Sequence, residues 1–192
     1  MYKKLGSFIF LLLLLVGCSN DSGDTDQVPA LFQAVYDNDL AKVKELTKTN
    51  NGSINALYNG STVLHAAIYN LDMEMIEALV GAGADYTLKD KYGETSFFLA
   101  SDLANIKAIK CFLYKGVDPN EINQDGDTPL MRFAVRCNII IDVFLDTMDM
   151  MVKSGADLTI KNNQGETLLS KIESMVDSED TLHQIKNHMT SY

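Results

Sequence analysis

Apolar residues in the middle of the chain recur at helical spacing. Leu64 and Ala67 are three residues apart, as are Ile76 and Leu79, so each pair lies on one face of a helix. Gly83 follows the second pair, where a helix commonly ends in a left-handed residue. The pattern predicts two antiparallel helices that bury these faces, followed by a hairpin-like turn over 85–92.

This helix pair repeats along the chain. Gly60, Gly93 and Gly126 follow one another at a constant interval of 33, and Gly165 comes next at an interval of 39. Threonines and a second series of glycines keep the same intervals: Thr62, Thr95, Thr128 and Thr167, then Gly83, Gly116 and Gly155. A fixed period of this length is the signature of a repeat architecture.

The repeated threonines stand where each first helix should begin. Their hydroxyl groups can accept hydrogen bonds from the exposed backbone N–H groups of the first turn. Pro129 directly follows Thr128, at the first helical position, where the missing N–H group costs little. The four threonines are therefore predicted to be helix N-caps.

The block that begins at Gly60 reads Gly-x-Thr-x-Leu-His-x-Ala, with Gly-Ala-Asp further on, and it resembles the ankyrin repeat. The resemblance implies an all-α fold, an ankyrin-repeat solenoid of about five helix-turn-helix units with hairpin-like turns between them. The domain spans 29–192, with units at about 29–58, 59–91, 92–124, 125–163 and 164–192. His65 alone matches the histidine of the family; Phe98, Met131 and Ser170 replace it in later units.

The first and last units depart from the pattern. In the first, Leu31, Ala34, Val43 and Leu46 precede the four apolar residues of the second unit by 33. It lacks the opening glycine and threonine, and the last unit is polar toward its end. Both are predicted to be capping repeats, which close the ends of a repeat array.

The N-terminus has the pattern of a lipoprotein leader. Two lysines precede an apolar run that is too short to span a bilayer, so 1–17 is predicted to be a signal peptide. Leu15-Val16-Gly17-Cys18 resembles the bacterial lipobox, which implies acylation of Cys18 and a tether over 18–28. Ser19 after the cysteine indicates, by the same resemblance, the outer membrane facing the periplasm.

Composition narrows the function further. A formal net charge of −10 disfavours a nucleic-acid partner, which needs clustered lysine and arginine. No pattern typical of a catalytic centre, a metal site or a phosphate-binding loop occurs, so the sequence predicts no enzyme, no cofactor and no small-molecule substrate. Cys111 and Cys137 are interpreted either as thiols in separate repeats or as a disulfide in an oxidising compartment.

The resemblance to ankyrin arrays places a protein-binding surface on the first helices and the hairpin tips. By register, the first-helix candidates are Tyr36, Asp37, Tyr69, Asn70, Asp102, Leu103, Arg132 and Arg136. The hairpin candidates are Lys89, Lys91, Tyr92, Glu121, Asn123, Gln124, Lys161, Asn162 and Gln164. Tyr69, Tyr92 and Arg136 are the preferred anchors, because tyrosine and arginine often dominate binding energy.

The fourth unit is longer than the others, since its intervals are 39 rather than 33. Its apolar, methionine-rich segment 137–151 is interpreted either as a lengthened helix pair or as an adaptable contact surface.

Three classes of function fit the chain. In the first class, the chain binds and inhibits a partner protein. A resemblance to small ankyrin lipoproteins implies a sharper form of this class, an immunity protein against a secreted phospholipase toxin. Alternatively, it protects a periplasmic enzyme, or it is an adaptor that tethers an envelope complex.

Overall fold

The computed structural model describes residues 28–49, 54–137 and 140–192. The predicted signal peptide, Cys18 and the tether up to residue 27 lie outside the described residues. The chain divides into two compact units, one ending at Asp85 and the other beginning at Tyr86. We call them unit 1 and unit 2 and describe each by itself.

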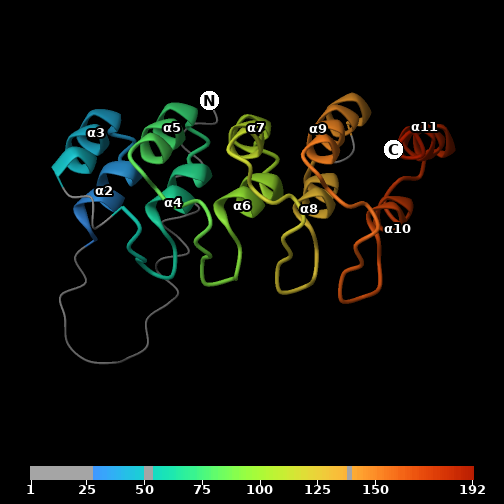
Figure 1. The fold of residues 1–192 in the computed structure, drawn as a ribbon, viewed down its shortest axis with the longest axis horizontal. Coiled ribbons are helices and arrows are strands. Elements are labelled where there is room, and N and C mark those ends of the chain that lie inside the picture. Colours follow the sequence, from blue (N-terminus) through green and yellow to red (C-terminus); the bar gives the residue numbers. More distant parts are fainter. Residues whose placement is uncertain (1–27, 50–53, 138–139) are drawn as a thin grey trace. The chain divides into compact units, whose positions relative to one another are not determined.

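The part of unit 1 that the structure describes contains two helix pairs. The first pair is α2 (Ala30–Tyr36) with α3 (Leu40–Thr49), and the second is α4 (Val63–Tyr69) with α5 (Met73–Gly81). The two first helices, α2 and α4, pack on each other, and so do the two second helices, α3 and α5 (Figure 1). The pairs therefore stack in two rows, which we call the inner row (first helices) and the outer row (second helices).

Unit 2 contains three pairs built in the same way. They are α6 (Ser96–Asp102) with α7 (Ile106–Tyr114), α8 (Pro129–Arg136) with α9 (Ile141–Lys153), and α10 (Leu168–Glu173) with α11 (Glu179–Met189). Helices α6, α8 and α10 form its inner row, and α7, α9 and α11 its outer row (Figure 1). The all-α, helix-turn-helix repeat predicted from the sequence is thus confirmed.

The repeated threonines begin the inner-row helices, as predicted. The hydroxyl oxygens of Thr62, Thr95, Thr128 and Thr167 each accept a hydrogen bond from the backbone N–H three residues later. In α4, the Oγ1 atom of Thr62 also lies 2.8 Å from Nδ1 of the buried His65. The family's threonine–histidine contact is therefore present in this repeat.

The core lies between the two rows. The predicted apolar positions Leu64, Ala67, Ile76 and Leu79 are fully buried. In the first pair Leu31, Ala34 and Val43 are also buried, whereas Leu46 is only half-buried. Helix α3 packs against α2 and α5, and Val43 is its one buried residue among those described. Leu46 therefore contributes less to the core than its position in the repeat predicts.

The extra length of the fourth repeat appears as a longer outer-row helix. Helix α9 has 13 residues, against nine in α5 and nine in α7. Its residues Phe144, Met148 and Met151 are fully buried, and the Phe144 ring stacks on Phe133 of α8 with centroids 6.5 Å apart. These three side chains are therefore core, whereas Ile140, before the helix, is exposed. The burial of Phe144, Met148 and Met151 supports the lengthened-helix interpretation.

Cys111 and Cys137 are both present as thiols. Cys137 is buried, at the end of α8, and Cys111 is half-buried in α7. The disulfide alternative is therefore not formed in this structure.

Candidate functional site

In unit 1, the predicted binding residues lie at the C-terminal ends of the inner-row helices. Tyr36, Tyr69 and Asn70 are half-buried and Asp37 is exposed. The Asn70 side chain donates a hydrogen bond of 2.7 Å to the Val35 carbonyl, which ties α4 to α2. Burial, followed by the nearby Tyr58, raises the pKa of Tyr36 to about 12. This end of unit 1 thus presents tyrosine and amide groups beside one exposed acid, Asp37.

The matching surface of unit 2 carries a network of charged side chains. The Asp102 carboxylate of α6 binds two guanidinium groups of α8: Arg132 Nε and Nη2 lie 2.7 and 2.5 Å away, and Arg136 Nη2 lies 3.2 Å away. The Asp102 side chain is 15% exposed, whereas that of Arg136 is 51% exposed. Leu103, beside Asp102, is 36% exposed. The structure therefore joins Asp102, Arg132 and Arg136 in one network, and the exposed Leu103 follows Asp102 directly in the chain.

A second buried acid extends this network toward the last repeat. Asp127 is almost fully buried and accepts hydrogen bonds from Lys171 Nζ at 2.7 Å and from Asn162 Nδ2 at 2.9 Å. Arg132 Nη1 lies 3.8 Å from the same carboxylate. Because a buried carboxylate is stable only when charged or polar groups satisfy it, these contacts fix α10 against the turn before α8.

The hairpin before α6 presents its predicted residues to solvent. Lys89, Lys91 and Tyr92 are exposed, and the Lys91 ammonium lies 5.1 Å from the centre of the Tyr92 ring, a cation–π contact. The later hairpins expose Gln124, Lys161 and Gln164.

Two of the predicted contact residues, Asn123 and Asn162, instead stabilise the hairpin turns, and Asp90 has the same role in the hairpin before α6. The side-chain oxygens of Asp90, Asn123 and Asn162 each accept hydrogen bonds from the backbone N–H groups two and four residues later, at 2.8–3.0 Å. Local bonds of this kind are what favours Asp and Asn in turns. Asn162 is buried and Asn123 half-buried, so both support the hairpin. Their common register with Asp90, at intervals of 33 and 39, could have shown this role.

Glu121, another predicted contact residue, is also partly buried. It is half-buried and accepts a hydrogen bond from the Thr95 hydroxyl, the group that caps α6. Burial raises the pKa of Glu121, while the hydrogen bond from Thr95 lowers it by less. This residue therefore supports the start of α6 and offers little surface to a partner.

Three residues in the register of the inner row escaped the sequence-based prediction. Val135 follows Asp102 at the interval of 33, and Met175 follows Arg136 at the interval of 39. Both extend the predicted binding positions into the last two helix pairs, and Met175 is 38% exposed. Lys171, at the same interval of 39 from Arg132, was missed as well. The register that located the other candidates could have located these three.

The described part of the chain offers no metal site. No group of three or more His, Cys, Asp or Glu side chains within residues 28–49, 54–137 and 140–192 is placed to hold a metal ion. Of the helices α2 to α11, none is long and apolar enough to cross a membrane.

Comparison with known protein families agrees with this geometry. A family model of ankyrin repeats (three copies) matches residues 2–90, and a model of the single ankyrin repeat matches residues 125–163. The chain belongs to the ankyrin-repeat family. Ankyrin repeats are protein-interaction modules, so the family and the inner-row surfaces together indicate a protein-binding chain.

Several ankyrin-repeat relatives are similar over part of their length. An ankyrin repeat protein of fowlpox virus is 40% identical over 62 residues, which are 32% of this chain and 24% of the relative. An ankyrin repeat protein of Rickettsia bellii is 34% identical over 52% of this chain and 58% of its own length. An interferon antagonist of vaccinia virus is 27% identical over 76% of this chain and 53% of its own length. The chain spans a quarter to somewhat over half of these relatives.

Proposed function

We propose that this ankyrin-repeat protein is a membrane-anchored inhibitor of one partner protein, and that the partner is a secreted phospholipase toxin. In this proposal the chain is an immunity lipoprotein, acylated at Cys18 and held at the bacterial outer membrane facing the periplasm. The support for the anchor is the lipoprotein pattern of residues 1–18, and a tether there would keep the inhibitor where a lipase attacks.

The observation that carries the binding proposal is the inner-row surface of unit 2. Arg136 is half-exposed, yet the Asp102 carboxylate already holds its guanidinium in place. A side chain ordered before binding loses less entropy when a partner arrives. Leu103, which follows Asp102 in the chain, adds an exposed apolar group. An ordered arginine and an exposed leucine on one inner-row surface are the kind of centre on which a protein interface depends.

The experiment is a protection assay. The full chain is produced in a bacterium together with one of a panel of secreted phospholipases directed to the periplasm, and survival and lipase activity are measured. We expect one lipase to be neutralised, and we expect Leu103→Asp or Arg136→Glu to abolish protection. Tyr114→Asp is the matched control, because Tyr114 lies at the end of the outer-row helix α7 and is 91% exposed.

The outcomes separate the parts of the proposal. Protection that survives both inner-row variants places the interface elsewhere. A partner that binds but stays active contradicts inhibition and favours the protective role. Cys18→Ala should leave binding intact and weaken protection; unchanged protection would contradict the need for an anchor.

A further inference from the structure

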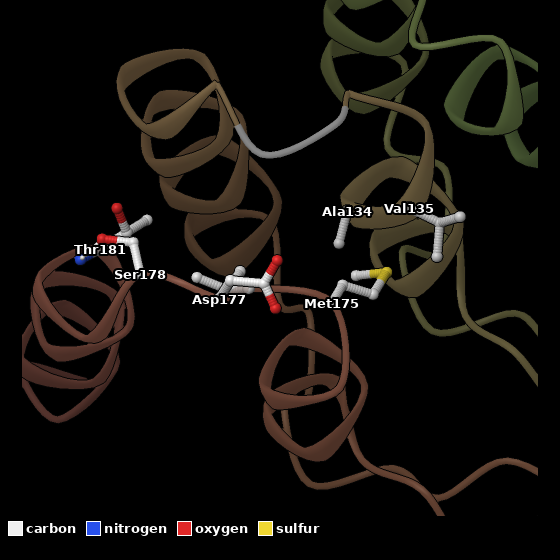
Figure 2. A pocket seen from close by; sticks show the side chains of 7 residues that line it. Ala134, Val135, Met175, Asp177, Ser178 and Thr181 are labelled. Carbon is white, nitrogen blue, oxygen red and sulfur yellow. Dashed lines mark hydrogen bonds between the residues drawn. The ribbon is translucent and has the colours of Figure 1, made fainter.

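A cavity of about 200 Å³ opens beside the inner row of unit 2, between the end of α8 and the loop that joins α10 to α11 (Figure 2). The apolar residues that line it are Ala134 and Val135 from α8 and Met175 and Val176 from the loop. Val135 and Met175 share the register of Asp102 and Arg136. The cavity therefore continues the surface that carries the proposed function.

The cavity also has polar lining residues. They are Asp177, Ser178 and Thr181, at the start of α11. Figure 2 shows the Asp177 carboxylate between the Ser178 side chain and Met175. The structure places no cation within salt-bridge distance of Asp177 in residues 28–49, 54–137 and 140–192. Asp177 is exposed, so its charge remains available to a ligand.

Two more acids follow Asp177 in the sequence. Glu179 and Asp180 are exposed in the first turn of α11. The cation that follows Val135 along α8, Arg136, is bound to Asp102. The chain as a whole has a formal net charge of −10, which favours association with basic surfaces.

We propose that this cavity receives a lysine or arginine side chain of the partner protein. The methylene stem packs on Val135 and Met175, and the cationic head meets the Asp177 carboxylate. Lysine and arginine have this combination of an apolar stem and a charged end. A purely apolar side chain would cover the Asp177 carboxylate without a compensating charge, and an acidic one would be repelled. The inference rests on the proposed function and specifies the chemistry of its partner.

The test uses short random peptides displayed on phage and selected on the full chain. Each enriched peptide is synthesised, and a second version carries norleucine in place of its lysine, which keeps the stem and removes the charge. Affinities are measured for the wild-type chain, Asp177→Asn and Asp177→Lys. Asp142→Asn is the matched control, because Asp142 is an exposed acid in the first turn of α9 that does not line the cavity.

We expect enriched peptides to contain a required lysine or arginine. Asp177→Asn should weaken them by about five- to tenfold, Asp177→Lys more strongly, and Asp142→Asn not at all. The norleucine peptides should be insensitive to Asp177→Asn. Peptides that need no cation, or that ignore both Asp177 variants, overturn the inference, as does a selection that enriches nothing.

A further variant separates this inference from the proposed function. Peptides that lose affinity with Leu103→Asp but not with Asp177→Asn show that the inner row binds and that only the cavity was assigned wrongly. Peptides that ignore both variants count against the surface itself.

Discussion

Two neighbouring helix pairs of unit 2, α8/α9 and α10/α11, follow the same repeat pattern but differ in the interactions that stabilise them. The α8/α9 pair has nine buried residues, Pro129, Leu130, Met131, Phe133, Ala134, Phe144, Thr147, Met148 and Met151. The α10/α11 pair has three, Leu168, Ile172 and Ile185. Since apolar burial is the main stabilising term in folding, the second pair should be the weaker.

Polar contacts replace part of the missing burial in the α10/α11 pair. Lys171 of α10 binds the buried Asp127, and His188 of α11 lies 2.5 Å from the Asp149 carboxylate of α9. The Tyr192 hydroxyl donates to the same carboxylate. Such contacts contribute less than core packing and depend on charge state. We therefore expect the last pair to open while the pair before it stays folded.

The largest effect should come from the core of the α8/α9 pair. Phe133→Ala removes a fully buried ring that stacks on Phe144, and we expect a loss of about 3–5 kcal/mol in the free energy of unfolding. Ile185→Ala in α11 removes a smaller side chain, and its loss should be about 2–4 kcal/mol and confined to the last pair. Urea unfolding and amide hydrogen exchange measure both. A loss for Ile185→Ala that spreads evenly over unit 2 would show that the two pairs unfold together.

The next effect tests how the turn before α8 packs against the turn that joins the two pairs. Gly126 has a φ of +78°, and a Cβ atom there would lie 2.8 Å from the backbone nitrogen of Asn163. Gly116 has nearly the same φ, +79°, but nothing within 4 Å of a Cβ atom. Gly116→Ala should therefore cost only the left-handed backbone, about 1–2 kcal/mol. Gly126→Ala should cost more, because the Asn163 backbone must move. Equal losses in thermal unfolding would show that the close approach has no energetic weight.

The pH dependence of the α10/α11 pair provides a smaller effect. Hydrogen bonds from His188, then from Tyr192, lower the pKa of Asp149 from its ordinary 3.8. A carboxylate with a lowered pKa stabilises the folded state above its ordinary pKa, and this contribution is lost as the pH falls through the folded-state value. The amides of α11 should therefore exchange faster in acid, relative to those of α8. Asp149→Asn should remove this acid-dependent difference, while Asp142→Asn should retain it.

Sequence alone predicted most of the architecture. The recurring intervals of 33 and 39 located the inner-row helices, and the threonine at each start could be assigned as an N-cap from local chemistry. These features depend on neighbours in the chain, so a periodic pattern suffices to predict them. The length of α9 was left between two interpretations, because an apolar methionine-rich segment suits both a core and a contact surface.

The side-chain contacts between repeats could not be predicted in this way. Asp102 with Arg136, Asp127 with Lys171 and Asp149 with His188 join residues 34 to 44 positions apart. Which of several acids meets a given cation depends on the rotation between successive repeats and on side-chain rotamers, and a repeat period specifies neither. The cavity at Asp177 was missed for the same reason, since residues from two repeats line it.

The smallest effect should have the opposite sign. Glu121 is half-buried next to the Thr95 hydroxyl, and burial raises the pKa of its carboxyl group. A raised pKa means that the folded state binds the proton more tightly than the unfolded chain, so at neutral pH the charged carboxylate destabilises the fold. Glu121→Gln removes this charge and keeps an oxygen that can accept from Thr95. We therefore expect a gain of less than about 1 kcal/mol at neutral pH, which shrinks as the pH falls through the raised pKa of Glu121. Chemical unfolding of both proteins over a range of pH measures the difference. A variant that is less stable than the wild type at neutral pH would show that the charge itself strengthens the cap of α6.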